Sequence, residues 1–290
     1  MICNLCPRNC GAERTPTAAG GACRMPAHPV VAKAMLHLWE EPCLTGEHGA
    51  GTVFFSGCNL RCCFCQNGCI SQEGVGKPVT PARLREIFKE LVAQGAACID
   101  LVTPTHFTPA VLEALGDEPW PVPVVWNCGG YEKAETLRLL EGKVQVYLPD
   151  LKYAMPEPAR AYSAAEDYFQ RAKEAILEMF RQTGPYRMEE GQLRSGVLIR
   201  HLLLPGELEN TRRCIDWVAE TFRPGDVLFS LMSQYTPQPG AEGKLSRRVT
   251  KAEYRAAVAY MENCGIVDGF TQDIASAQKE YTPDFDLSGV

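Results

Sequence analysis

The apolar residues of the chain recur at helical spacing in some segments and form short continuous runs in others. Thr80 and Pro81 suit the start of one helix, and Gly95 suits its end. The apolar side chains between them lie on one helical face, at Leu84, Ile87, Phe88, Leu91 and Val92. The segment from Pro81 to Gln94 is therefore predicted to be an amphipathic helix.

Strand-like runs and helix-like segments alternate along most of the chain. Strands are expected at Thr52–Ser56, Cys98–Val102, Val122–Trp126, Val144–Leu148, Val197–Leu203, Val227–Leu231 and Ile266–Phe270. Further helices are expected at Pro109–Leu115, Lys133–Leu140, 157–182, Thr211–Thr221 and Lys251–Asn263. Such alternation predicts an α/β fold, in which helices cover a parallel sheet. Six or seven strand and helix units are fewer than the eight of a closed TIM barrel.

Composition and charge narrow the class of protein. The 290 residues are 46% hydrophobic and 22% charged, as in an ordinary globular protein. The net charge of -6 and the lack of a basic run argue against nucleic-acid binding. The amino terminus does not resemble a signal peptide, and no apolar stretch reaches the ~18 residues that a membrane helix needs. We therefore expect a cytoplasmic protein that does not associate with membranes.

The first 50 residues form a separate, cysteine-rich extension in this interpretation, and residues 51–290 form the α/β unit. Cys3, Cys6, Cys10 and Cys23 lie among Pro and Gly residues, without helical or strand periodicity. So short a segment has too little apolar content to fold alone, and bound metal would stabilise it. Four thiolates suit zinc or an iron-sulfur cluster, and unligated thiols are the third alternative.

A second group of thiols follows the first predicted strand directly. Cys58, Cys62 and Cys65 have three and then two residues between them, so one short loop can carry them around one metal centre. Thiolates favour iron-sulfur clusters, zinc or Cu(I). Three thiolates on a 4Fe-4S cluster would leave one iron open to another ligand. Alternatively Cys69 could complete a closed four-thiolate zinc or electron-transfer site.

The motif Cys58-x3-Cys62-x2-Cys65, with the aromatic Phe64 before its last thiol, resembles the signature of the radical S-adenosylmethionine (radical SAM) superfamily. The resemblance implies a partial (β/α)6 TIM-like barrel, a 4Fe-4S cluster and S-adenosylmethionine. It further implies that the cofactor is cleaved reductively to a 5'-deoxyadenosyl radical, which abstracts hydrogen from a substrate. A reduced flavodoxin- or ferredoxin-type protein would supply the electron.

The amino-terminal pattern Cys3-x2-Cys6-Pro-Arg-x-Cys10 is similar to that of the pyruvate formate-lyase activating enzyme-like subfamily. This likeness favours an auxiliary 4Fe-4S cluster over zinc at the extension. It also implies an activating-enzyme-like oxidoreductase, whose substrate is a glycyl radical enzyme partner. A small molecule or peptide substrate is the alternative within the superfamily. The alternative from another class is a closed iron-sulfur or zinc protein that carries electrons or acts as a scaffold.

Cofactor contacts are expected where the strands end, because ligands of parallel α/β folds bind at that edge. Thr103 and Thr105 stand where the superfamily often has Gly-Gly-Glu-Pro, so their hydroxyls or carbonyls would hold the methionine ammonium. Asn127 follows the third predicted strand, with two glycines close behind it.

Three charged residues complete the expected cofactor site. Asp150 and Lys152 resemble the Asp-x-Lys segment of activating enzymes, where a carboxylate would accept from the ribose hydroxyls and an ammonium would pair with the methionine carboxylate. Arg200 lies within an apolar strand, and a buried charge needs a partner. That partner is either the cofactor carboxylate or a carboxylate of the protein itself.

Overall fold

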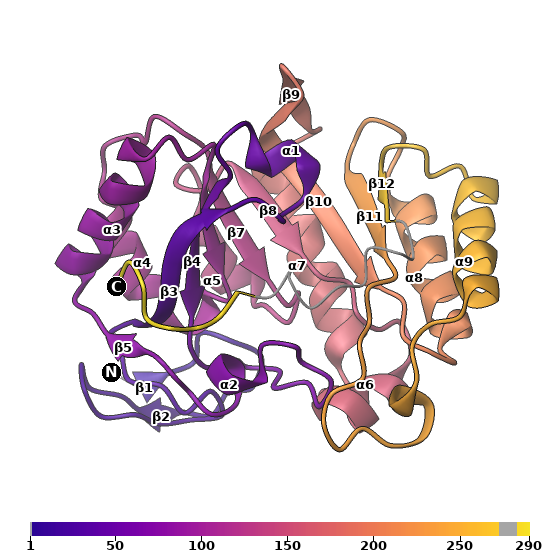
Figure 1. The fold of residues 1–290 in the computed structure, drawn as a ribbon, viewed down its shortest axis with the longest axis horizontal. Coiled ribbons are helices and arrows are strands. Elements are labelled where there is room, and N and C mark those ends of the chain that lie inside the picture. The colour runs from indigo at the N-terminus through magenta and orange to yellow at the C-terminus, as the bar shows by residue number, and fades with distance from the viewer. Residues whose placement is uncertain (1, 273–282) are drawn as a thin grey trace.

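A computed structural model of the chain describes residues 2–272 and 283–290. Its centre is a sheet of ten strands, ordered β12-β11-β10-β8-β7-β6-β4-β3-β5, with β9 paired to β10 (Figure 1). The mutually parallel strands are β4 (Ala50–Phe55), β6 (Ile99–Val102), β7 (Val124–Cys128), β8 (Val146–Pro149), β10 (Gln192–Leu202), β11 (Leu228–Met232) and β12 (Gly269–Thr271). The antiparallel members are β3 (Val30–His37), β5 (Lys77–Pro78) and β9 (Arg187–Glu189). The predicted fold class, a mixed α/β partial barrel, is confirmed.

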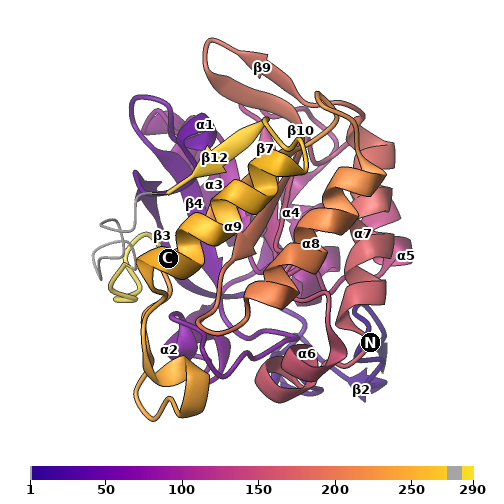
Figure 2. The same cartoon turned by 90° about the vertical axis from the view of Figure 1, so that its right-hand side faces the viewer.

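Helices connect the parallel strands and cover the outer face of the sheet (Figures 1 and 2). They are α3 (Pro81–Ala93), α4 (Thr108–Leu115), α5 (Ala134–Arg138), α6 (Pro156–Ser163), α7 (Tyr168–Thr183), α8 (Leu208–Thr221) and α9 (Lys251–Asn263). Shorter elements are α1 (Pro42–Thr45), α2 (Gly68–Ser71), and the 3-10 turns Thr105–Phe107 and Gly243–Ser246. No helix of the described ranges has the length and apolarity needed to cross a membrane.

Some boundaries differ from the expectation. The segment 157–182 is two helices, because Ala164 adopts a left-handed conformation with φ of 46° and ends α6. Strand β7 continues through Asn127 and Cys128, which were expected to follow it. Strand β10 starts at Gln192, five residues before the predicted Val197, because its first part pairs with β9.

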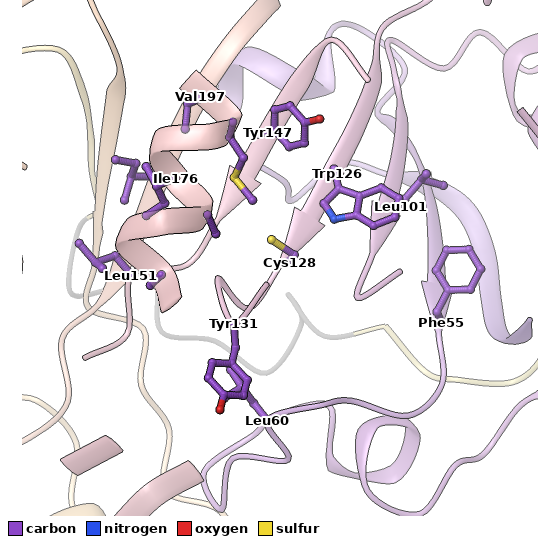
Figure 3. Packing of buried hydrophobic residues seen from close by; sticks show 14 of the residues in the cluster. Phe55, Leu60, Leu101, Trp126, Cys128, Tyr131, Tyr147, Leu151, Ile176 and Val197 are labelled. Atoms are coloured by element: carbon purple, nitrogen blue, oxygen red, sulfur yellow. The ribbon is translucent and has the colours of Figure 1, made fainter. Parts of the chain in front are cut away.

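Alternate residues of each strand point outward into the main hydrophobic core. Trp126 and Tyr147 on neighbouring strands are both fully buried, and Ile176 of α7 belongs to the same cluster (Figure 3). The period of two along a strand sends the intervening residues into the barrel. The inner face is therefore where the chain can present polar groups.

Helix α1 closes the end of the barrel where the parallel strands begin. Its Cys43 and Leu44 form a small apolar cluster with inward residues of the strands, including Ala50, Val146 and Leu198. One layer further along the strands, the inward side chains Thr52, Asp100 and Ser230 are polar and fully buried, and Arg200 of β10 is part-buried among them. The barrel thus has an apolar base and, above it, a polar layer.

The first residues form a small two-stranded unit of β1 (Ile2–Cys3) and β2 (Ala12–Glu13). In both views this unit lies at the same end of the molecule as α2 and α6, opposite α1 and β9 (Figures 1 and 2). Since α2 and α6 follow β4 and β8, this is the end where the parallel strands finish.

Candidate functional site

A cavity of about 240 Å³ opens where the parallel strands end. The loop after β4 contributes Cys58, Cys62, Phe64 and Cys65 to its wall. The other strand ends contribute Thr103, Asn127, Asp150, Lys152, Arg200, Gln234 and Tyr235. Most of the residues expected to bind cofactor are therefore brought together, although they are spread over more than 140 positions of the sequence.

The sulfur atoms of Cys58, Cys62 and Cys65 each accept a hydrogen bond. The backbone N–H of Leu60 donates to Cys58 Sγ over 3.4 Å, Ser163 Oγ donates to Cys62 Sγ over 3.0 Å, and Ser71 Oγ donates to Cys65 Sγ over 3.3 Å. Such donors stabilise thiolates and are typical of sulfur that ligates iron.

Burial and neighbouring sulfur raise the pKa values of the Cys58 and Cys65 thiols, which favours their protonated forms while no metal is bound. Burial, and then Cys62 and Cys65, raise the pKa of Cys58 to about 12. Metal binding must therefore displace protons. In residues 2–272 and 283–290 no three Cys, His, Asp or Glu side chains converge in a metal-binding arrangement. The donor set still fits an iron-sulfur cluster, because three soft ligands with hydrogen-bonded sulfurs surround one cavity.

Cys69 and Cys63 differ in position from the three cavity cysteines. Cys69 lies on α2 and packs against Ala32, Phe54 and Ile70, and it does not line the cavity. Cys63 is exposed. Cys58, Cys62 and Cys65 therefore line the cavity, whereas Cys63 and Cys69 do not.

Arg200 is held by three side chains at the floor of the cavity. Its Nε donates to Asp150 Oδ1 over 3.2 Å, its Nη1 donates to Glu40 Oε1 over 3.2 Å, and its Nη2 donates to Asn127 Oδ1 over 2.6 Å. Asp150 also pairs with Lys152 at 2.5 Å. Burial alone would raise the pKa of Asp150, but Lys152 and Arg200 hold it below its ordinary value.

Glu40 was not identified from the sequence, although it completes this group. It follows β3, lines the cavity, and accepts a hydrogen bond from Asn127 Nδ2 over 3.2 Å as well as the one from Arg200. Its neighbour Glu41 is buried, and that burial raises its pKa to about 7. The only signal in the sequence was a pair of acidic residues before Pro42, which also suits an exposed turn.

Thr103 and Thr105 lie in different environments. Thr103 lines the cavity with φ of 60°, a backbone conformation that costs energy for a β-branched residue. Thr105 is buried, does not line the cavity, and donates a 2.6 Å hydrogen bond to Glu132. Burial raises the pKa of Glu132 to about 8.

Aromatic side chains form one wall of the cavity. Phe64 is buried, and its ring meets the rings of Tyr162 and Tyr235 edge to face, at 6.2 and 6.3 Å between centroids. These contacts fix the segment between Cys62 and Cys65 against α6 and the end of β11.

Three of the amino-terminal cysteines lie near one another, and one of them, Cys23, lies beside the β4 loop. Cys3, Cys6 and Cys23 are buried, whereas Cys10 is exposed. Burial, and then the nearby Glu132, Cys23 and Cys3, raise the pKa of Cys6 to about 12. The carbonyl oxygen of Cys23 lies next to Gly57, where a Cβ would approach it to 3.0 Å.

No protein-family model matches the chain. It is 30% identical over 272 residues to the uncharacterized protein MJ0674 of Methanocaldococcus jannaschii, a match that covers 90% of this chain and 74% of that protein. The structure of this chain is similar to the crystal structure of Streptococcus suis SuiB bound to S-adenosylmethionine, with a TM-score of 0.48 and 12% identity. That match covers 79% of this chain, which spans 52% of the SuiB chain.

Proposed function

The chain belongs to the same family as the uncharacterized Methanocaldococcus jannaschii protein, and we propose that it is a radical SAM enzyme. The observation that carries the proposal is the common cavity of Cys58, Cys62 and Cys65, which Cys69 does not line. A cluster held by three thiolates keeps one iron for the cofactor, whereas four thiolates would close it. When bound, the 4Fe-4S cluster would supply the electron that cleaves S-adenosylmethionine to a 5'-deoxyadenosyl radical.

The residues of the chain bind and orient the reactants in this proposal. The three thiolates would hold the cluster, with Leu60 N–H, Ser163 and Ser71 donating to their sulfurs. Phe64 with its aromatic neighbours would exclude water from that side.

Lys152 and Arg200 would bind the charged methionine end of the cofactor. Both side chains reach the cavity while paired with Asp150, so the protein holds them in place before a ligand arrives. The Asn127 amide donates to Glu40 through Nδ2 and accepts from Arg200 at Oδ1, so one lone pair of Oδ1 remains for a ligand. Thr103 would face the methionine ammonium, while Thr105 is held by its hydrogen bond to Glu132.

The amino-terminal cysteines would hold an auxiliary 4Fe-4S cluster or a zinc ion. The closeness of Cys3, Cys6 and Cys23 supports such a site, and the exposed Cys10 would have to turn inward to join them. Iron and zinc measured in a variant with Cys58, Cys62 and Cys65 all changed to Ala would identify the metal. Zinc without iron would contradict the auxiliary cluster.

The substrate would lose hydrogen to the adenosyl radical beside the cavity. A glycyl radical enzyme is one candidate, for which the chain would be an activating enzyme-like oxidoreductase. A small molecule or a peptide is the other, and Gln234 and Tyr235 support it because they line the same cavity and are not assigned to the cofactor. A reduced flavodoxin- or ferredoxin-type protein would deliver the electron in either case.

Product formation tests the proposal. Anaerobically reconstituted protein, given dithionite and S-adenosylmethionine, is expected to form 5'-deoxyadenosine and methionine. Changing Cys58, Cys62 or Cys65 to Ala should abolish both products, and Cys69→Ala should leave them. Iron-loaded wild-type protein without either product would contradict the radical SAM assignment. Equal loss in Cys69→Ala would instead contradict the assignment of three thiolates to the cluster.

A further inference from the structure

Arg8 joins the amino-terminal segment to the thiol-bearing loop. Its Nε donates to the Asn59 carbonyl oxygen over 2.7 Å, and its Nη2 donates to the Ser163 carbonyl oxygen over 2.7 Å. Its Nη1 donates to the Ala164 carbonyl oxygen. The guanidinium also lies over the Tyr131 ring, 5.3 Å from the centroid. One side chain thus bonds both the loop after β4 and the end of α6.

The end of α6 is suited to a cation. The last carbonyl groups of a helix have no partner within the helix, and they lie at the negative end of its dipole. Ala164 turns the chain into a left-handed conformation, so the carbonyls of Ser163 and Ala164 can be reached from outside the helix. A planar guanidinium reaches three acceptors at once, which the single ammonium of Lys cannot do with the same geometry.

The same helix end contacts the thiol-bearing loop at two further points. Ser163 Oγ donates to Cys62 Sγ over 3.0 Å, and the backbone N–H of Cys63 donates to the Tyr162 carbonyl oxygen over 2.9 Å. Arg8 bonds the loop on the other side, at Asn59, whose side chain is itself fixed to the Tyr131 carbonyl oxygen at 2.7 Å. The stretch from Cys58 to Cys62 is therefore held at both ends, and Arg8 reaches it from a segment outside both the loop and α6.

We propose that Arg8 is a positioning residue for the thiol-bearing loop. It holds the loop against α6 before any metal binds, so that the three sulfurs face one cavity. This inference rests on the proposed function, because only a ligand-bearing loop gains from being ordered in advance. The amino-terminal segment would then have a second role besides holding its own metal, because ordering this segment also positions Arg8.

Hydrogen exchange in the metal-free protein tests the inference without using cofactor chemistry. In Arg8→Ala the backbone amides of residues 57–66 should exchange at least about tenfold faster than in wild-type protein, because the loop opens locally more often. Arg8→Lys should give an intermediate rate. After reconstitution, the EPR line shape of the loop's cluster should change in Arg8→Ala and be restored in part by Arg8→Lys.

Lys133→Ala is the matched control. Lys133 Nζ donates to the Asn4 carbonyl oxygen over 2.9 Å and to Asn9 Oδ1, so it binds the same amino-terminal segment through contacts that involve neither the loop nor α6. Its variant should leave exchange of residues 57–66 unchanged. An unchanged rate in Arg8→Ala, or an equal increase in Lys133→Ala, would overturn the inference.

Two outcomes keep the inference separate from protein folding and from the proposed function. If Arg8→Ala fails to fold, Arg8→Lys decides, and wild-type exchange in that variant overturns the inference. If wild-type protein loads iron but forms no 5'-deoxyadenosine, the proposed function fails, while the exchange result still reports on Arg8.

Discussion

The polar layer inside the barrel shows how individual residues make a charged site stable. Arg200 satisfies two carboxylates and one amide, and its side chain is 15% exposed while that of Glu40 is 11% exposed. Charges taken this far out of water are stable only when each has a well-placed partner. Burial and the charge of Glu40 raise the pKa of Asp100 well above its ordinary value, which favours the neutral form of Asp100 beside these charges.

Glu40→Gln tests how much the Glu40 carboxylate, as a partner of Arg200, contributes to the free energy of unfolding. The variant keeps a hydrogen-bonding group near Asn127 and removes the negative charge facing Arg200, so we expect a loss of about 1–2 kcal/mol in the free energy of unfolding. Denaturant unfolding gives the value. Glu86→Gln is the control, because its 2.8 Å pair with Lys89 is about half exposed. It should cost less than about 0.5 kcal/mol, and an equal loss in both variants would contradict the account.

His201 predicts a pH dependence of stability. Its Nδ1 donates to the Leu151 carbonyl oxygen at 2.5 Å and its Nε2 accepts from Thr211 Oγ1 at 2.9 Å, and burial lowers its pKa from 6.5 to about 4. The folded state therefore binds a proton less readily than the unfolded state. The contribution of neutral His201 to the free energy of unfolding is complete above pH 6.5. It is lost as the pH falls toward 4, at a rate of at most about 1.4 kcal/mol per pH unit.

Comparison of wild-type protein with His201→Gln isolates this effect. Unfolding free energies measured between pH 8 and pH 4 should fall less steeply below pH 6.5 in the variant. The difference between the two slopes should correspond to about one proton taken up on unfolding. Identical slopes in the two proteins would show that His201 does not titrate between the folded and unfolded states.

At the scale of elements, the ends of β7 and β8 are packed together by a glycine and a tyrosine. Tyr168 Oη on α7 donates to the Asp150 carbonyl oxygen at 2.6 Å, and it accepts from the Lys152 N–H at 2.9 Å. Gly130 has φ of +76°, and a Cβ there would fall inside contact distance of the Asp150 carbonyl oxygen. The position of Asp150 and Lys152 in the cavity therefore depends on the absence of a side chain at residue 130.

Gly130→Ala should disrupt the site by a clash, and Gly142→Ala measures the backbone strain alone. Gly142 has a similar φ of +77°, and no described atom lies within 4 Å of the position that a Cβ would take there. We expect Gly142→Ala to cost about 1–2 kcal/mol, and Gly130→Ala to cost more and to weaken S-adenosylmethionine binding in equilibrium titrations. Equal effects of the two changes would contradict the proposed contact.

The helices and strands with regular patterns were predictable from the sequence. Helix α9 has the predicted bounds, since Thr250 and Glu253 form a capping box at its start. Helix α1 and the turn carrying Glu40 were not predicted, because α1 has four residues and no periodic apolar face. Their conformation depends on the strands that they close, which local spacing does not encode.

At the scale of the whole molecule, the cavity is assembled from the ends of six parallel strands and a turn that enters from the opposite end of the sheet. The residues expected at strand ends could be found because parallel strands finish at one edge. Glu40, the third partner of Arg200, could not, since it is 160 positions away. In the sequence Arg8 stands out only as part of the pattern Cys6-Pro-Arg-x-Cys10, and its acceptors are backbone carbonyls that carry no sequence signature.

The EPR spectrum of reduced, iron-loaded protein before and after addition of S-adenosylmethionine tests the central claim most directly. If Cys58, Cys62 and Cys65 leave one iron open, the cofactor should change the g values of the signal that depends on these thiols. Cys58→Ala should lack that signal, and any remaining signal from the amino-terminal cysteines should not respond to the cofactor. A wild-type spectrum that S-adenosylmethionine leaves unchanged, with full iron loading, would contradict the account.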